Sequence, residues 1–164
     1  WGLFAKKGKV YSIEPEPRLM GSIKKTIERN NLSKTVIPLN IGVSDEIGEL
    51  DLYTFPGGSS GNIEQGHTEV IQVKTRTIDY IVQKEKINQL DLLKIDVDSI
   101  EEKILKGAEQ TLKNFKPIII TETNKSPSLI AYLQKMEYTL FDVKGHQVNI
   151  QDMPHDIIAI PLAN

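Results

Sequence analysis

The 164-residue sequence contains no cysteine, which excludes disulfide bonds, thiolate zinc sites and cysteine nucleophiles. It has no apolar run near the roughly 20 residues that a membrane-spanning helix needs, and no stretch has the form of a signal peptide. Neither sign of charge dominates, and a formal net charge of -2 gives no reason to expect nucleic acid or a membrane as a partner. We therefore expect a cytoplasmic protein.

Short apolar runs alternate with helical patterns along the sequence. Apolar runs at 10–13, 36–43, 90–97 and 117–121 predict strands, and stripes of apolar residues at helical spacing follow several of them. This alternation predicts βα units, a mainly parallel sheet and an α/β fold. Pro38 cannot donate a hydrogen bond to a sheet ladder, which places its strand at an edge or a bulge.

Two further pairs of apolar segments predict antiparallel strands. Segments 49–55 and 70–75 form a predicted hairpin, and the glycine- and serine-rich stretch 56–61 predicts a mobile loop between them. Segments 139–143 and 156–160, separated only by a turn region, predict an antiparallel pair at the edge of the sheet.

Hydroxyl residues predict where two helices begin. Ser99 and Glu102 have the spacing of a capping box before one continuous helical stripe from Ile104 to Leu112. Ser126 precedes Pro127, the combination of a cap and a proline at the first helical position.

Acidic residues stand where three predicted strands end: Glu14, Asp96 and Glu122. Ligands of open α/β sheets bind at the carboxyl ends of the strands, so these positions are candidates for a site. Glu14 can accept both hydroxyls of a ribose, or it can simply favour the positive end of the helix that follows.

Metal binding and histidine chemistry receive little support from the sequence. Asp96 and Asp98 could join Glu122 in an oxygen-rich site for a divalent cation, but nothing in the pattern brings three ligands to one centre. His67, His146 and His155 lie in predicted loops without spaced partners. We therefore predict no metal site and no catalytic histidine.

The order of these segments resembles the FkbM family of methyltransferases over nearly the whole chain. The segments that carry the resemblance are Val10–Pro17, Asn40–Asp45 with Gly48, Thr77–Asp79, Asp91–Asp98, Glu101–Ala108 and Pro117–Glu122.

The resemblance implies a three-layer, Rossmann-like class I methyltransferase sheet that is mostly parallel with an antiparallel terminal strand. It implies one domain over 1–164, with 49–75 as a hairpin insertion, and S-adenosylmethionine as the cofactor. Glu14 would bind the ribose, Asn40 and Gly42 would lie near the adenine, and Asp96 would lie at the methionine end. The implied reaction is methyl transfer to a hydroxyl of a sugar or small natural product, with Asp98 as the proton acceptor.

The sequence departs from the family pattern in two places. Asp98-Ser99 stands where the family typically has Glu-Gly. The first strand and glycine-rich turn of the family should precede Trp1, which predicts about 20–30 further residues upstream and makes 1–7 the helix after that turn. Two rival interpretations remain, a non-catalytic relic or binding module and an NAD-dependent dehydrogenase. The partner would be a small-molecule or glycan acceptor, with a homo-oligomer possible.

Overall fold

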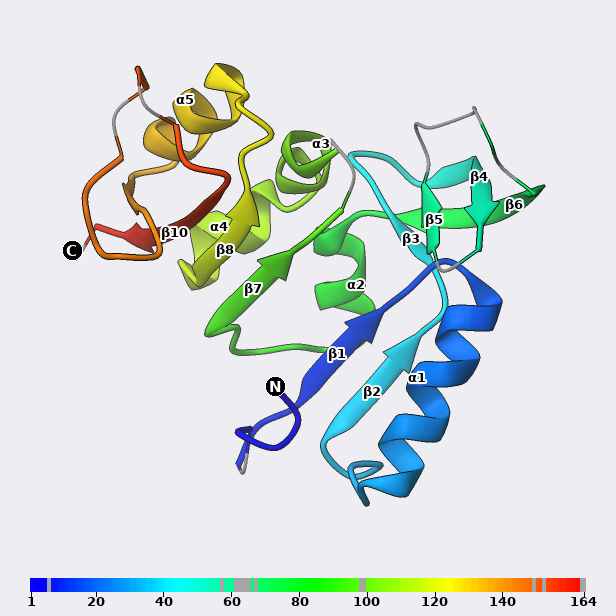
Figure 1. Cartoon of the computed structure of the whole chain (residues 1–164). Helices are drawn as coiled ribbons and strands as arrows, with labels where there is room; N and C mark the ends of the chain where they lie inside the picture. Colours follow the sequence, from blue (N-terminus) through cyan, green and yellow to red (C-terminus); the bar gives the residue numbers. More distant parts are fainter. Residues whose placement is uncertain are drawn as a thin grey trace. The chain divides into compact units, whose positions relative to one another are not determined.

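Short strands alternate with helices along much of the chain (Figure 1). The computed structural model describes residues 1–5, 7–56, 58–60, 66, 68–97, 100–148, 150–151 and 153–162. The chain divides into two compact units, Trp1–Arg76 and Thr77–Asn164.

The first unit contains two sheets. Its elements are β1 (Val10–Ile13), α1 (Pro17–Arg29), β2 (Val36–Leu39), β3 (Gly42–Val43), β4 (Gly48–Phe55), β5 (Gly58–Ser60) and β6 (Glu69–Arg76). Strands β1 and β2 pair in parallel, and the second sheet has the order β3-β6-β4-β5. The predicted hairpin is confirmed as an antiparallel pair, because β4 and β6 run antiparallel from Gly48 opposite Thr75 to Thr54 opposite Glu69.

The single strand expected over 36–43 is two strands that belong to different sheets. β2 pairs with β1, whereas β3 pairs with β6, and Asn40 and Ile41 separate them. Pro38 lies opposite Ser12 in the β1–β2 ladder. Among the strands that the structure describes, β2 has β1 as its sole neighbour, so the predicted edge position of Pro38 is confirmed.

Two local predictions for the first unit are wrong. Gly58–Ser60 is a short strand paired with β4, and Ser60 is buried, so these residues are not a loose loop; 57 and 61 lie outside the described residues. Trp1–Ala5 forms a single turn closed by bonds to the Trp1 carbonyl rather than a helix. Trp1, Leu3 and Phe4 are exposed, and a short segment without a buried face does not repay the cost of helix nucleation.

The second unit has one sheet with the order β7-β8-β10-β9. Its elements are α2 (Ile78–Lys84), β7 (Leu92–Ile95), α3 (Glu101–Lys106), α4 (Glu109–Phe115), β8 (Ile118–Glu122), α5 (Pro127–Lys135), β9 (Tyr138–Phe141) and β10 (Asp156–Pro161). Strands β7 and β8 are parallel, and β10 runs antiparallel to both β8 and β9. The antiparallel pair predicted at the end of the chain is therefore confirmed.

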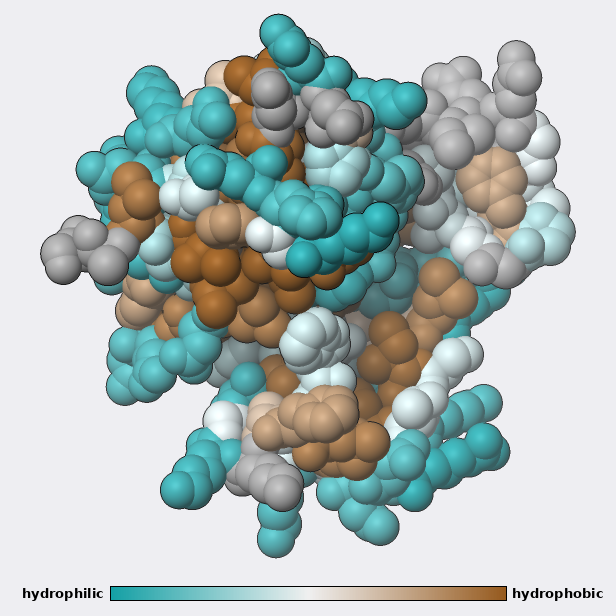
Figure 2. All heavy atoms as spheres, turned by 60° about the vertical axis from the view of Figure 1, so that its left-hand side comes forward, coloured by the Kyte–Doolittle hydropathy of each residue, from teal (hydrophilic) through white to brown (hydrophobic). Residues whose placement is uncertain are grey.

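Alternation along these strands decides which face of the second sheet is buried. The buried positions are Ile95, Ile119, Thr121, Tyr138, Leu140, Ile157 and Ala159. Leu129, Ile130 and Leu133 of α5 are fully buried as well, and α5 contacts β9, so the core lies between this face and the helices. The opposite face is also apolar, and apolar side chains are visible on the surface of this unit in Figure 2.

The helical stripe expected from Ile104 to Leu112 is broken into α3 and α4 at Gly107–Ala108. Asp79 of α2 stabilises the break, since its carboxylate accepts bonds from Gln110 N at 3.0 Å and Thr111 N at 2.8 Å in the first turn of α4. A carboxylate at this place satisfies amides that have no partner within the helix.

The capping box predicted at Ser99 stays a prediction. Ile100 occupies the N-cap position of α3 without a side-chain cap, and Ser99 lies outside the described residues. The prediction for α5 is confirmed, because Ser126 Oγ accepts a bond from Leu129 N at 3.3 Å.

Together these elements form a mixed α/β fold with several sheets. Across the described ranges, no helix combines the length and apolar character needed to cross a bilayer.

Candidate functional site

Glu14 follows β1 directly and is half-buried at the carboxyl end of the β1–β2 sheet. Its Oε1 accepts a hydrogen bond from the Glu16 amide at 2.8 Å, and its own amide donates to Leu39 O at 3.1 Å. Burial raises the pKa of Glu14, and the bond from the Glu16 amide opposes this rise. The backbone thus holds one carboxylate oxygen at a strand end, as an acceptor for ligand hydroxyls requires.

Asn40 lies at the end of β2 and links the two strand ends. Its Nδ2 donates to Glu14 O at 2.8 Å and to Pro15 O at 2.9 Å. Both amide hydrogens are therefore engaged in holding the turn that carries Glu14. The structure gives Asn40 a positioning role, and its predicted place beside an adenine stays a prediction.

Gly42 begins β3, where the space beside it is filled by the neighbouring strand. A Cβ at this position would lie 3.2 Å from Thr75 Cγ2, which is closer than side chains normally approach. Close packing against β6 therefore accounts for the glycine. Its predicted role near the adenine is untested.

Glu16 is a buried acid that was not among the residues predicted for the site. It occupies the N-cap position of α1 at 1% exposure, and Arg18 Nε donates to its Oε1 at 2.5 Å. Its Oε2 is buried without a hydrogen-bond partner among the described residues. A buried carboxylate oxygen normally accepts a hydrogen bond, so Glu16 Oε2 can accept one from a ligand. The sequence feature that could have identified Glu16 as a site residue is its position two residues after Glu14.

Asp96 and Glu122 end neighbouring parallel strands of the second unit, as predicted. Lys94 forms an ion pair with Asp96, and its hydrogen bond lowers the pKa of Asp96. Desolvation raises the pKa of Glu122, and the Asp96 carboxylate adds to this rise. The two carboxylates are therefore electrostatic neighbours. Asp98, the predicted proton acceptor, lies outside the described residues.

His155 is brought beside Glu122 by contacts that the sequence does not reveal. Thr123 N donates to His155 O at 2.7 Å, and Thr123 Oγ1 donates to Pro154 O at 2.6 Å. As a result His155 Nδ1 lies 3.8 Å from Glu122 Oε1 and 3.7 Å from Asp156 Oδ2. The ligand atoms of these three side chains lie within 4.8 Å of one another. These two carboxylate neighbours were not evident from the sequence, in which His155 has no spaced partner.

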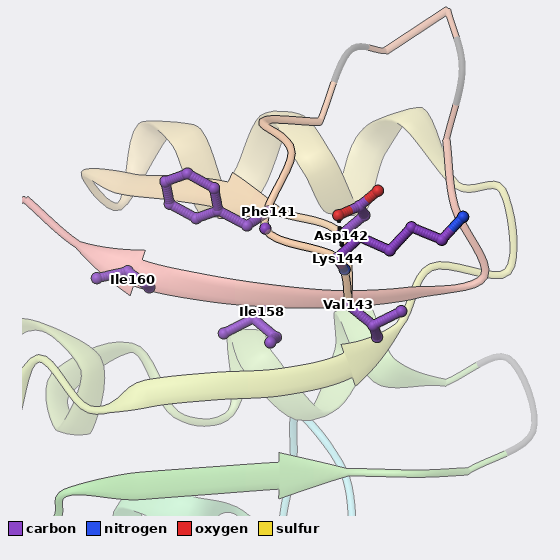
Figure 3. A pocket seen from close by; sticks show the side chains of 7 residues that line it. Phe141, Asp142, Val143, Lys144, Ile158 and Ile160 are labelled. Carbon is purple, nitrogen blue, oxygen red and sulfur yellow. Dashed lines mark hydrogen bonds between the residues drawn. The ribbon is translucent and has the colours of Figure 1, made fainter.

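A shallow pocket of about 400 Å³ lies beside β9, β10 and the turn that follows β9 (Figure 3). Its lining is mainly apolar, with Phe141, Val143, Ile158 and Ile160. The Asp142 carboxylate that reaches it already accepts bonds from two backbone amides. None of the predicted site residues lines this pocket, and its chemistry suits a polar cofactor poorly.

Comparisons with known proteins agree with the resemblance. Residues 2–147 match the family model described as the Methyltransferase FkbM domain. The hexuronic acid methyltransferase AglP of Haloferax volcanii is 25% identical over 114 residues, which cover 70% of this chain and 47% of AglP. The chain thus spans about half the length of this curated relative.

A solved structure resembles the fold. It is methyltransferase FkbM from Methylobacillus flagellatus KT, with a TM-score of 0.63 at 15% identity. The match covers 93% of this chain and 36% of that one, and at this identity it informs the fold alone.

Proposed function

The chain belongs to the FkbM family of methyltransferases, and from this premise we propose that it forms part of an enzyme that methylates a hydroxyl of a sugar or small natural product. The relative named as a hexuronic acid methyltransferase supports a sugar as the acceptor. Family membership disfavours the dehydrogenase interpretation. A relic without activity is the remaining alternative, and cofactor binding tests it.

We propose S-adenosylmethionine as the cofactor and a class I, Rossmann-like arrangement as the finer description of the fold. Bound in this protein, S-adenosylmethionine would supply a methyl group on a positively charged sulfur. The half-buried Glu14 is the observation that carries the proposal: its Oε1 is held by a backbone amide, and the described contacts leave its second oxygen for a ribose hydroxyl.

The unpaired Oε2 of Glu16 fits the same group. A nucleoside carries hydroxyl and amino donors, and a buried acceptor without a donor is costly until one arrives. Asn40 supports the turn between them through its two bonds to backbone carbonyls. These contacts make the end of β1 suited to hold the nucleoside part of a cofactor.

The remaining roles are proposals from the family pattern. Asp96 would lie at the methionine end, Gly42 near the adenine, and Asp98 would accept the proton of the acceptor hydroxyl. We also propose that both units belong to one domain, because the family model spans the boundary between them. The cytoplasmic location and the homo-oligomer stay predictions from the sequence.

Cofactor binding by Glu14→Gln tests the proposal. We expect S-adenosylhomocysteine to bind the parent protein, and the variant to bind roughly 10-fold or more weakly, because a hydrogen bond to a charged group contributes about 1.5–3 kcal/mol. Titration calorimetry measures both. The control is Glu28→Gln, the same chemical change at an exposed position on α1.

Each alternative result has a clear meaning. Equal affinity of the parent and Glu14→Gln would remove Glu14 from the site. Failure of the folded parent to bind S-adenosylhomocysteine would favour the relic.

A further inference from the structure

Two carboxylates face each other at one end of the second sheet. Glu122 is the last residue of β8 and Asp156 is the first of β10, and the antiparallel ladder places them directly opposite one another. Side chains of directly opposite residues project from the same face of a sheet. Like charges in such a pair repel, so this arrangement costs stability unless a positive charge compensates.

Positive charge from the protein is scarce at this place. Within the part of the chain that the structure describes, no lysine or arginine forms an ion pair with Glu122 or Asp156, and Lys94 is engaged by Asp96. The neighbour of both carboxylates is the His155 imidazole. A neutral imidazole offers a nitrogen ligand rather than a charge.

The distances suit a metal ion. Bonds of about 2.1 Å to nitrogen and oxygen separate two ligands by roughly 3.0 Å at a right angle and 4.2 Å when they are opposed. The separations of 3.8 Å and 3.7 Å from His155 Nδ1 to its two neighbours fall within that range. All three ligand atoms lie within 4.8 Å of one another. Small rotations of these side chains can bring any longer separation into the range that one ion requires.

The backbone around the histidine is fixed independently of any ion. The amide and hydroxyl of Thr123 bind the carbonyls of His155 and Pro154, which ties the start of β10 to the end of β8. Thr123 is itself buried at 1% exposure. A backbone held in place near a ligand reduces the rearrangement that ion binding requires.

We propose that Glu122, His155 and Asp156 bind a divalent cation of the first transition series. Carboxylates suit Mn²⁺ and imidazole suits the later metals, so one nitrogen with two oxygens favours such ions over Ca²⁺, which prefers oxygen alone. The exposure of His155 and Asp156 leaves coordination positions for water or a ligand oxygen. This site includes none of the residues proposed to contact the cofactor, although one of them, Asp96, follows the neighbouring strand β7.

The chain has three histidines, His67, His146 and His155, so a proton NMR spectrum should contain few imidazole signals and make the test specific. Substoichiometric Mn²⁺ should broaden the His155 signal first. His146 provides an internal control, since its ring lies 3.1 Å from Asp142 Oδ2 in a pair with one carboxylate. Signals are assigned with the His155→Asn and His146→Asn variants.

Affinity for Mn²⁺ is measured on the same proteins from the loss of the free-ion signal in electron paramagnetic resonance. We expect Glu122→Gln and His155→Asn to weaken binding about 10-fold or more, and His146→Asn to leave it unchanged. Circular dichroism confirms that each variant is folded. Equal broadening of all three histidines, or an unchanged affinity in folded Glu122→Gln, would overturn the proposal.

Discussion

At the scale of single residues, Asp142 shows how one side chain closes a turn. Its Oδ1 accepts bonds from the amides of Lys144 and His146 at 2.8 Å each, and the His146 ring lies beside Oδ2. The bond from the His146 amide is the main cause that lowers the pKa of Asp142 below 3.8. The charged form is therefore favoured in the folded protein.

This pKa predicts how the stability of an Asp142→Asn variant depends on pH. A carboxyl group whose pKa is lower in the folded than in the unfolded protein stabilises the fold at a pH above its unfolded pKa. This stabilisation is lost as the pH falls through the folded pKa. The variant should melt at a lower temperature than the parent at pH 7, and the difference should shrink as the pH drops below 3.8. Melting curves across this range check it, with exposed Asp51→Asn as the control. A difference that stays constant with pH would contradict it.

At the scale of elements, the junction between α3 and α4 depends on Asp79 from α2. Besides the two amides of α4, the Asp79 carboxylate accepts a bond from Thr111 Oγ1 at 2.6 Å, and the Asp79 amide donates to Gly107 O at 3.0 Å. Asp79 therefore ties α2 to the junction between α3 and α4 through both its side chain and its backbone amide.

Replacing this carboxylate should destabilise the protein. We expect Asp79→Ala to reduce the free energy of unfolding by about 1–3 kcal/mol, because it leaves the buried Thr111 hydroxyl and two helix amides without their acceptor. Urea unfolding measures the change. The control is Glu109→Gln in the same helix, whose ion pair with Lys113 is exposed and should contribute at most about 0.5 kcal/mol. Equal effects of the two substitutions would contradict the capping role.

At the scale of the whole molecule, the proposal of one domain makes the two units depend on each other for stability. If they unfold together, the slowest amides of β6 and of β8 should exchange hydrogen with the same free energy of opening. Native-state hydrogen exchange measures both strands in one experiment. Separate opening energies would show that Trp1–Arg76 and Thr77–Asn164 are independent folding units.

The sequence by itself determined the elements whose signals are local. Short apolar runs mark β8 and β10, the Ser126-Pro127 pair marks the start of α5, and Pro38 marks an edge strand. These signals are local because a cap or an apolar periodicity depends on residues within one or two turns of chain. The strand-end positions of Glu14 and Asp96 were predicted in the same way.

Only the tertiary structure decided the features that join distant residues. The separation of β2 from β3 follows from their different partner strands, and the break between α3 and α4 is held by Asp79, about 30 residues away. His155 meets Glu122 through the bonds of Thr123, although no spacing in the sequence relates them. Such contacts depend on how strands and helices pack, and a linear pattern carries no record of which residues the packing brings together.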